Sequence, residues 1–119
     1  MTWTYSQSTG DLGLNNACVG VGYSGTGVGR NNSVMQGVRN VGPVPQGTYT
    51  IGQPHDTATH GPYVMVLTPV QGTNTFGRSG FLIHGDNKRH DASHGCIILD
   101  RTLRHRVWGS GDHTIQVTP

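Results

Sequence analysis

The 119-residue chain contains no glutamate, one lysine and two cysteines, and only 12% of its residues are charged. The absence of glutamate excludes an HExxH metalloprotease and a glutamate general base, and Lys88 lies in no P-loop motif. No stretch approaches the roughly 20 apolar residues of a membrane-spanning helix, so we expect no membrane insertion. The first residues lack the basic and apolar regions of a secretory signal, so we expect synthesis in the cytoplasm without a Sec-type leader.

Glycine, threonine and valine are plentiful, whereas the helix-favouring residues alanine, leucine, lysine and glutamate are scarce. This composition predicts a mainly β fold, and the length is typical of one domain, here residues 1–119. Apolar residues make up only 33%, but the net charge of +2 is too small for a typical disordered chain. Because the small excess of arginine is not gathered into a patch, we expect no nucleic-acid partner.

Short segments rich in β-branched or aromatic residues, each bounded by turn residues, predict strands. These segments are residues 2–7, 17–23, 47–51, 63–67, 81–84 and 114–117. One helix is predicted over 101–108, because Asp100 is a good N-cap and Gly109 follows its last turn. A shorter helical turn is expected near 33–40.

The segment from His84 to Cys96 holds the densest set of reactive side chains. His84 ends an apolar strand, and Cys96 follows the turn Ser93-His94-Gly95. A cysteine thiol needs a nearby base or positive charge to become a good nucleophile, so we predict a catalytic pair of Cys96 and His84. Gly95 allows a close approach of the backbone to a substrate, and the N–H groups of Gly95 and Cys96 are natural oxyanion donors.

These residues resemble the His…[Ser/Thr]-His-Gly-Cys signature of the L,D-transpeptidases, the YkuD-like family. The chain is most similar to the small L,D-transpeptidase effector domains delivered by type VI secretion systems. Weaker matches run along almost the whole chain, among them Trp3-Thr4-Tyr5, Gly22-Tyr23-Ser24-Gly25, Gly42-Pro43-Val44-Pro45 and Gly77-Arg78-Ser79-Gly80. The resemblance implies a compact L,D-transpeptidase-like β-sandwich or barrel with one or two short helices.

The resemblance also implies the roles of the site residues. Cys96 is the acylated nucleophile and His84 its base, while Ser93 and His94 shape the site. Gly85 follows His84, so a backbone carbonyl must orient the imidazole. The eight-residue spacer between His84 and Ser93 is shorter than in typical cell-wall transpeptidases and fits the effector type.

The implied substrates are peptidoglycan stem peptides. L,D-carboxypeptidase, exchange or cross-linking activity would run through a cysteine thioester, with no cofactor and no metal. The implied biological role is that of an antibacterial toxin of the cell wall, secreted and active in the target-cell periplasm. Its expected partners are a secretion apparatus and a cognate immunity protein.

For the substrate groove, we expect Tyr23, Ser24 and Asn32 to line the surface that receives a polar peptide–glycan. Arg78 and Arg101 are the candidates for binding the carboxylate of the substrate. These five assignments rest on residue type and position in the sequence.

Other interpretations remain open. A non-catalytic peptidoglycan-binding module is the main alternative, and a zinc-dependent hydrolase with ligands among His84, His90, His94 and Cys96 is a weaker one. A disulfide between Cys96 and Cys18 would abolish the nucleophile, but Cys18 lies in an apolar strand and is expected in the core. The remaining histidines are expected to be surface or structural residues: His55, His60, His105 and His113.

Overall fold

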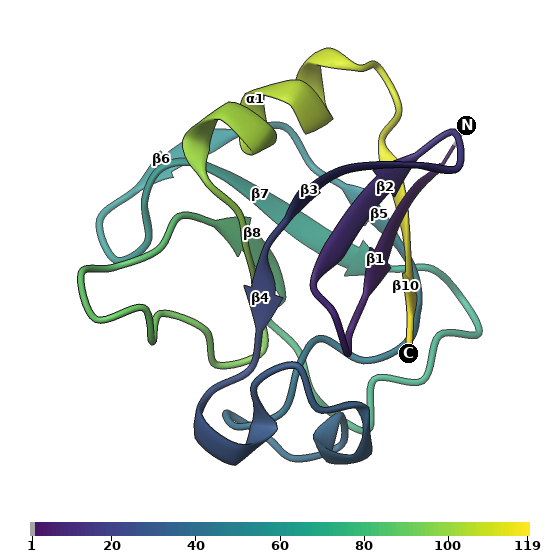
Figure 1. The fold of residues 1–119 in the computed structure, drawn as a ribbon, viewed down its shortest axis with the longest axis vertical. Coiled ribbons are helices and arrows are strands. Elements are labelled where there is room, and N and C mark those ends of the chain that lie inside the picture. The colour runs from purple at the N-terminus through teal and green to yellow at the C-terminus, as the bar shows by residue number, and fades with distance from the viewer. Residues whose placement is uncertain (1) are drawn as a thin grey trace.

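The computed structural model describes residues 2–119 as ten strands, one α-helix and two short 3₁₀ turns. The strands are β1 (Trp3–Ser6), β2 (Asp11–Leu14), β3 (Ala17–Val21), β4 (Tyr23–Ser24), β5 (Gly47–Ile51), β6 (His55–Thr57), β7 (Gly61–Pro69), β8 (Leu82–His84), β9 (Ile97–Ile98) and β10 (Thr114–Thr118). The helix is α1 (Arg101–Gly109), and the turns are η1 (Gly27–Gly29) and η2 (Ser33–Met35). Figure 1 shows α1 at one end of the sheet and the two 3₁₀ turns at the other.

The strands pair in the order β3-β2-β1-β10-β5-β7-β8-β9-β4, and β6 pairs with β7 beside this path. The pairs β1–β10 and β8–β9 are parallel, and all other pairs are antiparallel. The two ends of the path, β3 and β4, are separated in the chain only by Gly22, so the sheet must curl back on itself. Within residues 2–119 no pairing joins β3 to β4, so the sheet is curled but is not a closed barrel.

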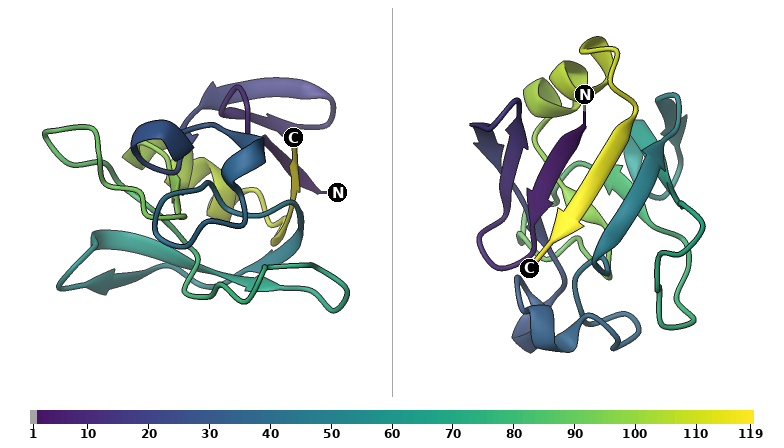
Figure 2. Two further views of the ribbon diagram at one scale, coloured as in Figure 1. Left: turned by 90° about the horizontal axis from the view of Figure 1, so that it is seen from below. Right: turned by 90° about the vertical axis from the view of Figure 1, so that its right-hand side faces the viewer.

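The core lies inside this curl. Strand β10 runs between β1 and β5, which Figure 2 shows side by side, and all three strands turn apolar side chains inward. The largest fully buried core side chains include Trp3, Tyr5, Tyr49 and Ile115. Helix α1 covers one end of the core with Val107 and Leu103.

The predicted mainly β domain with one short α-helix is confirmed, and Asp100 caps α1 by accepting a hydrogen bond from the Leu103 N–H at 2.8 Å. Strands β2, β6 and β9 were not predicted. Strand β2 contains aspartate and glycine, which rarely favour strands, and becomes a strand through pairing with β1 and β3. The turn expected over 33–40 is helical only at η2.

The prediction that Cys18 lies in the core is wrong. Cys18 is exposed, because β3 is an edge strand with a single neighbour, β2. Both cysteines are free, so the structure holds no Cys18–Cys96 disulfide. None of the helices in the described part of the chain has the length and apolar character to cross a membrane.

A pair of valine substitutions measures the contribution of the central strand. Val117 of β10 is 3% exposed, whereas Val21 of β3 is 62% exposed. Val117→Ala removes buried methyl groups and leaves a cavity, so it should lower the free energy of unfolding by about 2 kcal/mol. The matched Val21→Ala change should alter it by less than about 0.5 kcal/mol in the same urea titration. Equal effects of the two changes would contradict this assignment of the core.

Candidate active site

The parallel pairing of β8 and β9 places His84 and Cys96 on one face of the sheet. Ile83 pairs with Ile97 and His84 with Ile98, so the same register sets Cys96 beside Leu82. Side chains alternate along a strand, so Cys96 and His84 share the face opposite to that of Ile83. They lie two residue positions apart along this two-stranded ribbon.

His84 is held in a single tautomer. Its ring is 3% exposed, and Nδ1 lies 2.8 Å from the carbonyl oxygen of Gly85. A carbonyl only accepts hydrogen bonds, so Nδ1 carries the proton and Nε2 keeps its lone pair. This contact confirms that a backbone carbonyl orients the imidazole. Nε2 is buried and has no hydrogen-bond partner among residues 2–119.

The surroundings of His84 keep the ring neutral. Burial lowers its pKa below the usual value, and the nearby His60 and Arg104 lower it further. The Gly85 carbonyl and the Asp86 carboxylate act in the opposite direction without reversing the shift. An imidazole that is neutral at pH 7, with a free lone pair, has the properties of a general base.

Cys96 is 8% exposed and packs with Tyr23 and Ile98. Its Sγ lies 3.9 Å from the carbonyl oxygen of Gly80, to which the thiol donates. Burial raises the pKa of the Cys96 thiol, while a backbone hydrogen bond from Leu82 and the charge of Arg78 lower it less strongly. Within residues 2–119 no hydrogen bond joins this sulfur to His84. The resting state is therefore a neutral thiol beside a neutral imidazole.

Ser93 fixes the turn that carries Cys96. The Ser93 hydroxyl is buried, donates to the carbonyl of Cys96 at 2.6 Å and accepts from the N–H groups of Gly25 at 2.8 Å and Gly95 at 3.2 Å. Gly95 has φ +123°, a conformation that glycine adopts without strain, and its α-carbon lies against the Arg78 guanidinium. Because its N–H points to Ser93, Gly95 is better suited to shaping the turn than to donating to an oxyanion.

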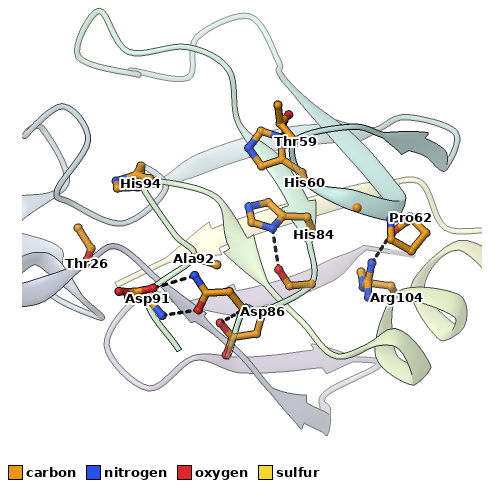
Figure 3. A pocket seen from close by; sticks show the side chains of 13 residues that line it. Thr26, Thr59, His60, Pro62, His84, Asp86, Asp91, Ala92, His94 and Arg104 are labelled. Carbon is orange, nitrogen blue, oxygen red and sulfur yellow. Dashed lines mark hydrogen bonds between the residues drawn. The ribbon is translucent and has the colours of Figure 1, made fainter. Parts of the chain in front are cut away.

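An open cleft of about 650 Å³ lies in front of His84. Its walls come from the β6–β7 turn, the segment after β8, the segment before Cys96, Thr26 and Arg104. In Figure 3 His84 occupies the middle of the wall, with Arg104 on one side and His94 and Asp91 on the other. Cys96 is buried and is not among the lining residues.

Two residues of the cleft were missed in the sequence. His60, expected to be a surface or structural residue, lies with its ring centroid 4.8 Å from that of His84, because β6 folds back on β7. No sequence pattern signals this approach. Arg104, to which the sequence analysis assigns no role, is buried, and its spacing of three residues from the buried Val107 was the available signal.

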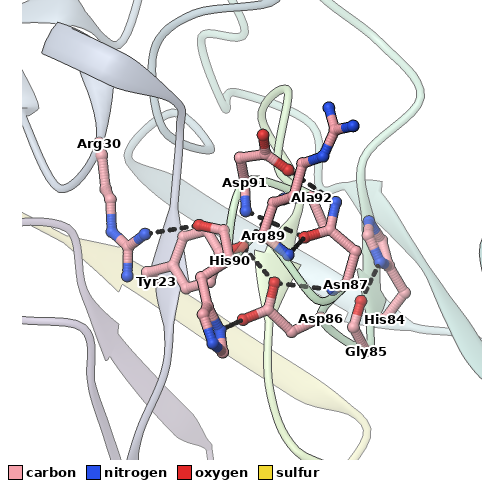
Figure 4. A network of polar contacts seen from close by, with 10 residues as sticks. All are labelled: Tyr23, Arg30, His84, Gly85, Asp86, Asn87, Arg89, His90, Asp91 and Ala92. Atoms are coloured by element: carbon pink, nitrogen blue, oxygen red, sulfur yellow. Dashed lines mark hydrogen bonds and ion pairs between the residues drawn. The ribbon is translucent and has the colours of Figure 1, made fainter.

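Three of the predicted substrate-binding residues hold the fold together instead of lining the cleft. The Tyr23 hydroxyl donates to Asp86 at 2.6 Å and accepts from the Ala92 N–H at 2.9 Å, as Figure 4 shows in part. Ser24 is buried and accepts from the Val44 N–H at 2.8 Å. Asn32 caps η2 by accepting from the Val34 N–H.

The two predicted carboxylate-binding arginines also lie outside the cleft lining. Arg78 is buried and donates to the carbonyls of Gln36, Gly42 and Pro43. It therefore connects the loop after η2 to the turn that contains Gly95, against which its guanidinium lies. Arg101 is exposed, and its Nε donates to His105 at 3.4 Å.

A polar network anchors the loop between His84 and Ser93 (Figure 4). Asp86 accepts from Tyr23 and contacts Nδ1 of His90 at 2.8 Å. Burial raises the pKa of the Asp86 carboxyl, but the hydrogen bonds from Tyr23, His90 and Asn87 outweigh burial and lower it overall. Asp86 is therefore ionised at neutral pH, and this charge fixes one wall of the cleft.

The residues considered as zinc ligands do not assemble into a site. In the part of the chain that the structure describes, no group of three or more His, Cys, Asp or Glu side chains is placed to hold a metal ion. His90 instead pairs with Asp86, and His94 contacts the carbonyl of Asn40 at 3.3 Å. The zinc-dependent alternative gains no support from this arrangement.

Comparison with known protein families adds an independent observation. A model of the Tlde1 domain matches residues 19–116, which include His84, Cys96 and the cleft. The chain belongs to the Tlde1 domain family. This membership supports a type VI secretion effector that is secreted into target cells, with a secretion apparatus and an immunity protein as possible partners. No curated protein sequence matches the chain.

The state of the Cys96 thiol in this Tlde1 domain is measurable. In a Cys18→Ser background, the ultraviolet absorbance of the thiolate should appear only above about pH 8.5, the ordinary value for a free thiol, because burial raises the pKa of Cys96. The unfolded protein in denaturant is the control and should titrate near that ordinary value. A thiolate already present at pH 7 would contradict the neutral resting pair.

Proposed function

We propose that this Tlde1 domain is a peptidoglycan-modifying cysteine enzyme, an L,D-carboxypeptidase or exchange transpeptidase of tetrapeptide stems, and an antibacterial toxin. The observation that carries the proposal is the state of His84. Its Nδ1–H donates to the Gly85 carbonyl, and the lone pair of its Nε2 accepts no hydrogen bond from residues 2–119. The ring faces an open polar cleft and shares a sheet face with Cys96.

Activation of the thiol requires its sulfur to leave the Gly80 carbonyl and approach Nε2 of His84, and we assign this to a rotation about the Cα–Cβ bond of Cys96. The Leu82 backbone and the Arg78 charge, which lower the pKa of the thiol, then stabilise the thiolate. Catalytic hydrogen bonds commonly tighten only when substrate is bound, so we assign this movement to the substrate complex.

The chemistry then follows in two steps. The sulfur attacks the carbonyl carbon of the third stem residue while Nε2 of His84 takes the thiol proton. The bond from that carbon to the nitrogen of D-alanine breaks, and His84 returns the proton to this leaving amine. Water attacks the thioester, the carbon–sulfur bond breaks, and the thiol and a tripeptide carboxylate result. A free D-amino acid in place of water gives exchange.

Removal of the sulfur is the first test. Wild-type protein should convert tetrapeptide stems to tripeptides, and Cys96→Ala should abolish this conversion because no thioester forms. The measurement is mass spectrometry of muropeptides after incubation with purified sacculi. Cys18→Ala, which removes the other free cysteine, is the matched control and should retain activity. Trimming by Cys96→Ala would contradict the proposal, and binding of sacculi by wild type without trimming would indicate a binding module.

The second test removes the base. His84→Gln should lower kcat/KM by about 10²- to 10⁴-fold, the usual contribution of a general base. His55→Gln is the matched control, because His55 is exposed and lies outside the cleft lining. A base must be neutral, and the pKa of His84 is lowered. Wild-type activity should therefore persist at about pH 6.5 and disappear only as the pH falls through that lowered pKa. An acid limb above about pH 7 would argue against His84 as the base.

A further inference from the structure

Arg104 is the one arginine or lysine among the residues that line the cleft. We propose that Arg104 binds a free carboxylate of the stem peptide next to the scissile bond and so determines substrate specificity. This inference rests on the proposed function for the identity of the peptide, and it replaces the earlier candidates Arg78 and Arg101.

The Arg104 guanidinium is held firmly from one side. Its Nη1 donates to the carbonyls of Pro62 at 2.7 Å and Tyr63 at 3.2 Å, and its Nε donates to the Asp100 carbonyl at 3.4 Å. These contacts join α1 to the start of β7 and fix the plane of the group. The donors of Nη2 are left for a ligand, since no hydrogen bond within residues 2–119 uses them.

The free Nη2 lies against Gly85. A Cβ on Gly85 would lie 2.8 Å from Nη2, so any side chain at this position would displace the guanidinium. Gly85 also accepts the Nδ1 hydrogen of His84. One glycine therefore brings the arginine and the base close together, with backbone alone between them.

No ion pair within residues 2–119 joins the buried Arg104 guanidinium to an acidic side chain. Burial and the neighbouring Arg101 lower the pKa of Arg104, and the charge of the Asp100 carboxylate offsets this only in part. A cation that is largely removed from water is costly unless an anion compensates it. The acidic residues of the cleft, Asp86 and Asp91, lie on the other side of His84 (Figure 3). A carboxylate entering the cleft is thus attracted to the Arg104 side and repelled from the opposite side.

Carboxylate binding at this point would also affect the base. The positive charge of Arg104 is one of the causes that lower the pKa of His84. A bound carboxylate offsets that charge, so His84 becomes a stronger base when the correct substrate is present. Substrates without the carboxylate would lose affinity and would also leave His84 less basic.

The test measures binding, not turnover. Cys96→Ala protein is titrated calorimetrically with three tetrapeptide stems: one with all carboxylates free, one amidated on the side chain of the third residue, and one amidated at the C-terminal D-alanine. We expect one of the two amides to bind at least about tenfold more weakly than the free form. The amide that binds more weakly identifies the carboxylate that Arg104 contacts. Equal affinity for all three stems would overturn the inference.

The arginine itself is tested in the same background. Arg104→Gln should bind the free and the amidated stem equally, whereas Arg101→Gln on the same helix should retain the preference. A full preference in Arg104→Gln would overturn the inference. If Arg104→Gln does not fold, the Nε–H resonance of Arg104 in the Cys96→Ala protein decides: it should shift with the free carboxylate and not with the amide that binds weakly. A resonance that is equally unmoved by all three stems would also refute the inference.

These outcomes are separable from those of the proposed function. Wild-type protein that binds the free stem through Arg104 but never trims it would refute the enzyme and leave the carboxylate site intact. Trimming by wild type without a carboxylate preference in binding would refute the site and leave the enzyme intact.

Discussion

The parallel pairing of β8 with β9 is the contact on which the candidate site depends. Its register sets His84 and Cys96 on the same face, although the loop between them is long and polar. A shift of one residue would turn Cys96 to the opposite face of the sheet, away from His84. The burial of Ile83 and Ile97 on the other face specifies this register, since a shift would expose both side chains.

Hydrogen bonds from buried side chains to the backbone supplement the small apolar core in fixing the loops. Only 33% of the residues are apolar, and the loops around the site are fixed by side chains that bond to the backbone. Buried Gln7 donates to the Val44 carbonyl at 2.8 Å, Arg78 holds three carbonyls, and Ser93 bridges two segments. An unsatisfied buried polar group is costly, so each of these bonds specifies one loop conformation.

Burial also determines the chemistry of the site. Both the Cys96 thiol and the His84 imidazole are removed from water, and burial disfavours the charged form of each. The site therefore rests as two neutral groups, and the proposed reaction requires charge to separate only once a substrate excludes water and supplies new contacts. His84 is oriented by the Gly85 carbonyl and not by a hydrogen-bonded carboxylate, and the more remote Asp86 charge does not reverse the effect of burial on its pKa.

The sequence by itself determined the mainly β class, α1 with its Asp100 cap, and the candidacy of His84, Cys96 and Ser93, because these follow from local patterns and a short motif. It did not determine the places of Tyr23, Ser24, Asn32 and Arg78, whose side chains bond within the fold, or of Arg101, which is exposed outside the cleft lining. Nor did it indicate that His60 and Arg104 reach the cleft. Those positions depend on how β6 folds back on β7 and how α1 is rotated against the core. Such contacts join residues far apart in the chain, and only the tertiary structure brings them together.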